Sequence, residues 1–376
     1  MPVPCFLLGR VCTPPTYADM SGSQERMCTF QWRVALNKTQ PYSLMVLLQL
    51  GFAGLHLLSV FTLKHGMNHY VLIVYRNIIA TLVMLPLALW FERNMRPKMT
   101  KGIFLKIFLL ALLSVLDQNF YYLGAKDTSA NFVASFNLVP VLTFIINILL
   151  RNEKIKIKNV RSWLKIIGVV VITGGSLVMI LYKGKTLGSL GTRASTNIER
   201  HQLFGTFMLL LSCLCGASFS TLQDHVLKSY STELSLSTFI CLFSVIISGV
   251  TTSIVKPNPS AWKIGWNLRL VSIIYSGVIC SGIAYYLQGV VIKKKGAVFS
   301  SAFSPLRMLI VDVLDPTVLA EAITLARIIG AVIMIIGLFL LLWGKMIDEK
   351  SKLEREEGVI DLPIVVPMRT STVNPM

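Results

Sequence analysis

Lys165-Ile-Ile-Gly168 recurs as Arg327-Ile-Ile-Gly330, and each copy has a second glycine seven residues on, Gly175 and Gly337. Glycines at this spacing lie on one face of an α-helix, two turns apart. In an apolar helix they allow a second helix to approach closely, so we expect these four to serve packing between the two copies and not substrate contact. The recurrence, at a separation of about 160 residues, decides the fold: the chain consists of two copies of one unit.

Other stretches repeat at nearly the same separation. Tyr121-Tyr122-Leu123 recurs as Tyr285-Tyr286-Leu287, and in each copy a phenylalanine then precedes a proline inside an apolar segment. The copies also end alike, with a glycine-lysine pair. This pair follows tyrosine and lysine in the first copy and leucine and tryptophan in the second. These matching features are Phe136 and Pro140 against Phe303 and Pro305, and Leu181–Lys185 against Leu341–Lys345.

The composition identifies the class of protein. Of the 376 residues 54% are hydrophobic and only 14% are charged, whereas soluble domains carry about 25% charged residues. The net charge of +18 would suggest a nucleic-acid partner in a soluble protein. Here the basic residues lie between long apolar runs, where they set orientation and contact anionic lipid head groups. We therefore expect a polytopic protein of the lipid bilayer, with no nucleic-acid partner.

Ten apolar segments of about 20 residues are long enough to cross the bilayer. With them we divide the chain into a disordered cytosolic tail, 1–40, a first five-helix repeat, 41–182, a linker, 183–201, a second repeat, 202–345, and a cytosolic tail, 346–376, also expected to be disordered. The segments run over about 42–63, 70–91, 103–124, 128–150, 162–182, 202–224, 234–255, 269–291, 296–319 and 324–344.

The orientation follows from the connecting loops. Those on the side of the two termini hold about twice as many Lys and Arg residues as those on the opposite side, which predicts cytosolic termini. Because five is odd, the second copy enters the membrane inverted relative to the first. Inverted repeats are typical of secondary transporters, in which the substrate site lies near the midplane between the copies. The fold class is an all-α membrane protein with two inverted repeats.

Two polar stripes are candidates for that site. In the third segment Asp117, Gln118 and Tyr122, together with Tyr121, lie close together on one side of a helix. Ser281, Tyr285 and Gln288 form an equivalent stripe in the eighth segment. Polar groups in hydrocarbon are costly and normally face a cavity or a partner. Hydrogen bonding between helices, without a ligand, is the alternative.

Further polar residues lie inside other segments. Gln49, Arg76 and Asn137 join the candidate substrate-binding residues, as do, less directly, Asn77 and Asn131. Arg76 would attract a carboxylate, pair with Asp117, or extend its side chain outward to the interface. Pro140 and Pro305 interrupt the backbone hydrogen bonding of their helices, which either frees carbonyl groups for a cavity or merely kinks the helix.

The ninth segment carries an unusual set of charges, Arg307, Asp312 and Asp315-Pro316. Arg307 needs a partner on another helix, and Asp117 is our candidate. Near Pro316 we expect the helix to kink or fray, because proline lacks the backbone donor.

Signatures of enzymes are absent from the sequence. It holds no nucleotide-binding P-loop, G-x-S-x-G or H-E-x-x-H motif, so we expect no catalysis, no ATP-driven pumping, no cofactor and no metal site. The five histidines are isolated, and we assign none of them to the site.

Several short motifs are specific when taken as a set. They are Tyr75-Arg76-Asn77, Phe91-Glu92-Arg93, Leu116-Asp117-Gln118-Asn119, Tyr182-Lys183-Gly184, Ser260-Ala261-Trp262, Ala284-Tyr285-Tyr286, Ala302–Leu306 and Leu342-Trp343-Gly344-Lys345. Together they resemble the plant nodulin-like, Walls-Are-Thin-related branch of the drug/metabolite transporter superfamily, built from two EamA-type repeats.

The resemblance implies facilitated export of small organic solutes such as amino acids or auxin, across the plasma membrane or the vacuolar membrane. We expect alternating access between the repeats, with Asp117 as polar anchor or as the site of proton coupling. A receptor-like or scaffold protein that transports nothing is the competing hypothesis, because a fold alone does not fix a function. The sequence leaves the individual solute and the oligomeric state open.

Overall fold

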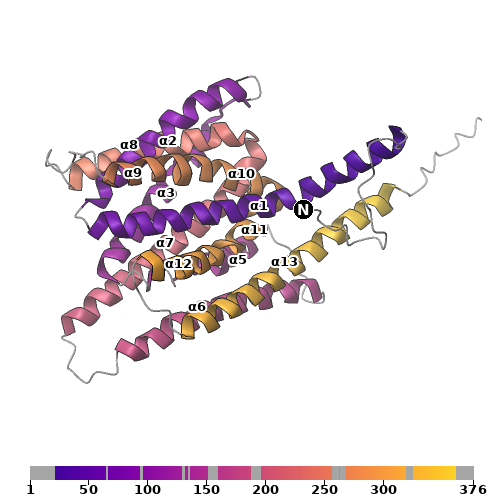
Figure 1. Ribbon diagram of the computed structural model, residues 1–376. Helices are drawn as coiled ribbons and strands as arrows, with labels where there is room; N and C mark the ends of the chain where they lie inside the picture. The colour runs from indigo at the N-terminus through magenta and orange to yellow at the C-terminus, as the bar shows by residue number, and fades with distance from the viewer. Residues whose placement is uncertain are drawn as a thin grey trace, which may run out of the picture. The chain divides into compact units, whose positions relative to one another are not determined.

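Every regular element described in the computed structural model is a helix (Figure 1). The structure describes residues 22–64, 67–93, 96–128, 132–133, 136–150, 160–187, 196–255, 262, 268–318 and 325–360. Within these ranges nine helical stretches are long and apolar enough to cross a membrane, and α5 (Val139–Leu149) is a shorter apolar helix in the expected fourth segment. The expected all-α membrane fold is confirmed.

The helices follow the order of the predicted segments. The first repeat contains α1 (Gly22–Lys64), α2 (His69–Phe91), α3 (Lys101–Asp127), α5 and α6 (Val160–Leu187). The second repeat begins with α7 (Thr196–Ser229) and α8 (Glu233–Val255). Its remaining elements are α9 (Leu268–Tyr275), the π-helix η2 (Ser276–Ile283), α10 (Ala284–Lys295), α11 (Ala297–Ala302), α12 (Ser304–Val318) and α13 (Leu325–Ile360).

Side chains are distributed as in a protein that a bilayer surrounds. Large apolar side chains such as Leu82, Trp90 and Ile254 are exposed, whereas polar side chains such as Gln223 and Ser244 are fully buried between helices. Lipid tails solvate the apolar exterior at no cost, and polar groups must find partners or a cavity inside. This arrangement positions the polar residues of the candidate site in the interior.

Corresponding helices of the two repeats pack against each other. α2 lies along α8, and α6 lies along α13, as Figure 1 also shows. A Cβ atom added to Gly168 would lie 2.9 Å from the carbonyl oxygen of Gly337, and one added to Gly175 would lie 2.9 Å from that of Gly330. Any side chain there would force the helices apart, so the predicted packing role of the four glycines is confirmed.

The chain divides into two compact units, residues 1–44 and 45–376. In the first, the described residues 22–44 are the N-terminal part of α1, although residues 22–40 were expected to be disordered. Residues 22–40 contain no proline, and extending an existing helix costs little once its nucleus has formed. Residues 1–21 lie outside the described residues.

The C-terminal segment is also more regular than expected. α13 continues to Ile360, past the predicted end of the last segment, because lysine, glutamate and leucine are good helix formers and no proline interrupts them there. Lys165 of α6 and Asp348 of α13 form an ion pair of 2.8 Å. α12 likewise runs through Pro316 to Val318, so the helix does not end where we expected it to fray. Residues 188–195 of the predicted linker lie outside the described residues, and the rest of it is helical, in α6 and α7.

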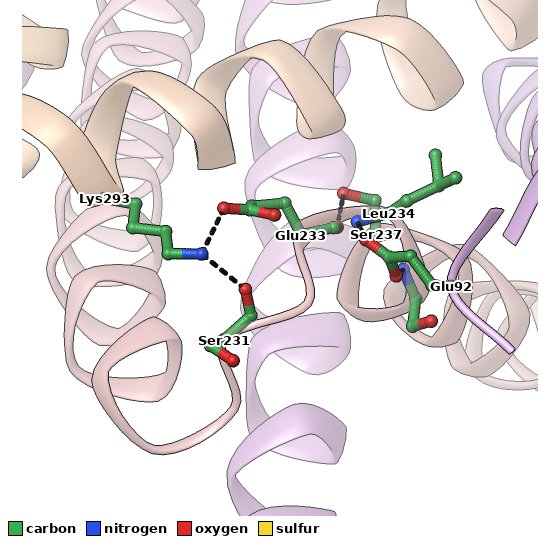
Figure 2. A network of polar contacts seen from close by, with 7 residues as sticks. Glu92, Ser231, Glu233, Leu234, Ser237 and Lys293 are labelled. Atoms are coloured by element: carbon green, nitrogen blue, oxygen red, sulfur yellow. Dashed lines mark hydrogen bonds and ion pairs between the residues drawn. The ribbon is translucent and has the colours of Figure 1, made fainter. Parts of the chain in front are cut away.

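A polar network joins the two repeats at the C-terminal end of α2 (Figure 2). The carboxylate of Glu92 accepts hydrogen bonds from the backbone N–H groups of Leu234 (3.1 Å) and Ser235 (2.6 Å), in the first turn of α8. Lys293, at the end of α10, forms an ion pair of 2.6 Å with Glu233 and donates to the carbonyl oxygen of Ser231. A residue of the first repeat thereby caps a helix of the second.

Candidate functional site

A cavity of about 220 Å³ lies between the helices of residues 45–376. Its wall is formed by α1, α2, α3, α7, α10, α11 and α12, together with residues that precede α5. It brings together eight of the nine candidate residues from both repeats: Gln49, Arg76, Asp117, Gln118, Tyr122, Asn137, Tyr285 and Gln288. Ser281 is fully buried and is not part of the wall.

Hydrogen bonds join the two polar stripes. The hydroxyl groups of Tyr285 on α10 and Ser114 on α3 lie 2.5 Å apart, and the amide of Gln118 donates to both, at 3.0 and 3.1 Å. The amide oxygen of Gln118 is buried and has no hydrogen-bond partner. Gln118 is therefore held by its nitrogen, and its oxygen stays available as an acceptor at the cavity.

Arg76 has a different environment from the ones we expected. Its side chain is only 5% exposed, so it does not extend outward to the interface. Its guanidinium donates to the hydroxyl of Ser281 at 2.5 Å and to the carbonyl oxygen of Cys280 at 3.4 Å, both in η2. It forms no ion pair with Asp117 among the residues described. Arg76 thus fixes the π-helix to α2 and also lines the cavity.

Asp117 is half-buried and faces the cavity from α3. Its carboxylate accepts a hydrogen bond of 2.6 Å from the hydroxyl of Ser212 on α7. A Cβ atom added to Gly216 would lie 3.7 Å from this carboxyl group, so the glycine on α7 leaves room beside it. One neutral donor leaves most of the acceptor capacity of a carboxylate unused.

Arg307 of α12 does not pair with Asp117 as we expected. Both line the cavity, but no ion pair joins them in the described part of the chain. The guanidinium carbon of Arg307 lies 5.9 Å from the centre of the Phe52 ring, within the range of a cation–π contact. Since helix α12 and the Phe52 ring position Arg307, the cavity contains a cation and an anion that do not neutralise each other directly.

The fourth and ninth segments are broken at the cavity. Phe303 separates α11 from α12, and Phe136–Leu138 precede α5 without helical structure. Asn137 donates to the hydroxyl of Ser304 at 2.8 Å, so the starts of α5 and α12 meet. Pro140 and Pro305 lie in the first turns of these helices, where the missing N–H group costs nothing. Two positive helix ends therefore reach the cavity wall.

Two of the remaining candidates, Gln288 and Tyr122, are held by hydrogen bonds across the cavity wall. Gln288 of α10 donates to Ser220 of α7 at 3.2 Å, and the hydroxyl of Tyr122 lies 3.2 Å from that of Ser59 on α1. Gln49 lies on α1 and is only 4% exposed. Asn131, which we had also considered, lies outside the described residues.

Sequence reasoning missed His56, which lines the cavity with 7% of its surface exposed. Its Nδ1 atom lies 2.7 Å from the hydroxyl of Tyr121. A signal was present: Gln49, Phe52, His56 and Ser59 follow one another at helical spacing on one face of the first segment. The partners Ser212 and Ser304 gave no such signal, because serines are common throughout these helices.

Comparison with known proteins identifies the family. Residues 39–181 and 203–343 each match the EamA-like transporter family. The chain belongs to this family. It is thus a membrane transporter of the drug/metabolite superfamily, and the two EamA repeats agree with the repeats in the sequence.

Proteins similar to this chain include several from Arabidopsis thaliana. The WAT1-related proteins At1g44800 and At4g08300 are 42% and 40% identical to this chain, over 86% and 88% of it and 90% and 92% of their own lengths. One solved crystal structure, 17% identical, covers 80% of this chain and 98% of its own with a TM-score of 0.56. That likeness concerns the fold alone.

Proposed function

We propose that this EamA transporter carries small organic solutes with a carboxylate group, such as amino acids or auxin, by alternating access between the repeats 41–182 and 202–345. The observation that carries the proposal is the pair Asp117 and Arg307, which line one cavity without an ion pair. Charges that are partly removed from water and lack an opposite charge are destabilised, so a cargo that supplies the missing opposite charges is favoured.

The charges match an amino acid or an acid with an N–H group. Arg307 and the two helix ends at Asn137 and Ser304 favour a carboxylate. Asp117 favours an ammonium or another N–H donor, and the free oxygen of Gln118 accepts a further hydrogen bond. Aromatic rings at Phe52 and elsewhere in the wall offer contact for an apolar side chain.

The size of the cavity supports a metabolite as cargo. Pockets for drug-sized ligands measure about 300–1,000 Å³, and this cavity measures about 220 Å³. A single amino acid or a small aromatic acid suits such a volume better than a peptide does.

The proposal includes orientation and coupling. The excess of basic loop residues supports cytosolic termini, in the plasma membrane or the vacuolar membrane. Asp117 is our candidate for a proton site, since it is the carboxylate of the cavity wall. A pH gradient imposed on vesicles should then change the rate of wild-type uptake and leave Asp117→Asn unaffected.

Uptake by reconstituted vesicles tests the proposal. Purified protein in liposomes should take up labelled L-phenylalanine or indole-3-acetate faster than empty liposomes, and excess unlabelled solute inside should accelerate exchange. Arg307→Gln should reduce the rate at least about tenfold, as expected for loss of a charged hydrogen bond. Failure of the wild type with both solutes and with other amino acids would support a receptor-like or scaffold protein instead.

A further inference from the structure

One polar atom of the cavity wall remains without a role. The Nε2 atom of His56 is buried and has no hydrogen-bond partner, although the opposite ring nitrogen is bonded to Tyr121. A buried polar atom without a partner destabilises the protein. The side chain is only 7% exposed and lines the cavity, which indicates that a bound cargo supplies the missing hydrogen-bond partner.

The hydrogen bond to Tyr121 determines which ring nitrogen of His56 carries the proton. A neutral imidazole has one donor and one acceptor nitrogen. If the Tyr121 hydroxyl donates its proton to Nδ1, then Nδ1 is the acceptor nitrogen and Nε2 carries the imidazole proton. In the reverse arrangement the proton of the Tyr121 hydroxyl would have no hydrogen-bond acceptor among the described residues, so the first arrangement is favoured.

Two guanidinium groups line the same cavity as His56. They belong to Arg307 on α12 and Arg76 on α2, and Asp117 on α3 is the one carboxylate in the described wall. With Nδ1 accepting from Tyr121, Nε2 carries a proton, so His56 presents an N–H donor to this cavity.

We propose that His56 binds the cargo: its Nε2–H group donates a hydrogen bond to the carboxylate that Arg307 also attracts, and Tyr121 positions the ring. This inference rests on the proposed transport of carboxylates and adds a second donor to the carboxylate subsite. It assigns Tyr121 as a positioning residue, because its hydroxyl acts on the cargo only through the imidazole.

The experiment compares substitutions of His56 in reconstituted vesicles, with whichever of labelled L-phenylalanine or indole-3-acetate the wild type takes up. His56→Asn removes the donor at the Nε2 position, whereas His56→Gln returns an N–H donor of similar reach. We expect KM to rise about tenfold or more in His56→Asn with the maximal rate little changed, and to recover in His56→Gln. His225→Asn, at an exposed position of α7, is the matched control.

A second readout isolates the carboxylate. The amide of the chosen solute should compete less well than the acid against wild-type uptake, and this preference for the acid should shrink in His56→Asn. Tyr121→Phe should produce a smaller loss of this preference. The imidazole of His56 stays in place, but without the Tyr121 hydroxyl its proton is no longer held at Nε2.

The outcomes separate the two proposals. If the wild type takes up neither solute, the proposed function and this inference both fail. If it transports, but His56→Asn keeps the wild-type KM and acid preference, the inference alone fails. It also fails if His56→Gln is as impaired as His56→Asn, which would indicate a packing role for the imidazole.

Discussion

The network around Glu92 allows a quantitative prediction about stability. In α8 the first backbone N–H groups have no acceptor within the helix, as at any helix start. Glu92 supplies both acceptor oxygens from the other repeat, and the Ser235 group that it satisfies belongs to a residue that is only 1% exposed (Figure 2). Glu92→Ala should therefore leave two N–H groups without partners.

The expected cost follows from these contacts. Loss of a helix cap costs about 0.5–2 kcal/mol, and loss of a negative charge at a helix start about 0.3–1 kcal/mol more. We expect Glu92→Ala to lower the free energy of unfolding by about 1–3 kcal/mol, the sum of the two contributions. Glu92→Gln keeps one acceptor oxygen without the charge and should cost about 1 kcal/mol.

Lys293→Ala is the matched control within the same network. The Lys293 side chain is 42% exposed, and its ion pair with Glu233 is therefore screened by water. Such pairs contribute about 0–1 kcal/mol. The control removes a charge at this end of the helices without uncovering a backbone donor.

Thermal unfolding of the purified protein in one detergent measures the series. The midpoint Tm should fall in the order wild type, Lys293→Ala, Glu92→Gln, Glu92→Ala, with the first two close together. A Glu92→Ala variant as stable as wild type, or a Glu92→Gln variant no better than Glu92→Ala, would refute the capping role of Glu92.

Three further predictions concern transport, packing and orientation. Asp117→Asn keeps an acceptor for Ser212, so it should fold normally but lower transport about tenfold or more. Asp224→Asn, outside the cavity wall, should leave the transport rate unchanged. Equal rates in the two variants would leave Asp117 a structural role only. Gly168→Leu should separate α6 from α13 and destabilise the protein by about 1–3 kcal/mol in unfolding assays, whereas Gly174→Leu, with nothing within 4 Å, should change little. The N-glycosylation sequon Asn37-Lys38-Thr39 should carry no glycan when the protein is made in microsomes. An increase in mass that a glycosidase removes would reverse the proposed orientation.

The sequence predicts the helices and the repeat well for a physical reason. Apolar segments of membrane length and the glycines at 168, 175, 330 and 337 are local features, and their consequences hold in any helical packing. The stripes of Gln118 and Tyr285 are equally local, and the structure places them together. Partners across helices follow from packing angles that no local pattern contains, which is why the expected pairing of Arg307 with Asp117 is wrong.

The positions of the helix breaks, and the contacts made there, are the other feature that sequence reasoning missed. Pro140 and Pro305 were assigned to interrupted helices, yet the meeting of Asn137 with Ser304 depends on where two half-helices end. Glu92 caps α8 from 142 residues away in the sequence, and such a contact has no periodic pattern in the sequence that could predict it. His56 was visible in the helical spacing of the first segment, but a single histidine has no pattern by itself.

The π-helix η2 has a consequence for comparing the two repeats. A π-helical turn accommodates one residue more than an α-helical turn, so the residues before Ser276 are rotated relative to those after Ile283 when compared with a straight α-helix. Tyr285 can therefore be matched to Tyr121 by counting, whereas positions in α9 cannot be matched to the start of α3 without a gap. An ancestral insertion of one residue here would have turned Tyr275 toward α1, where its hydroxyl donates to the carbonyl oxygen of Gly51 at 3.1 Å. Deleting one residue from Ser276–Ile283 should undo that rotation and detach α9 from α1, while α10 keeps its register at the cavity.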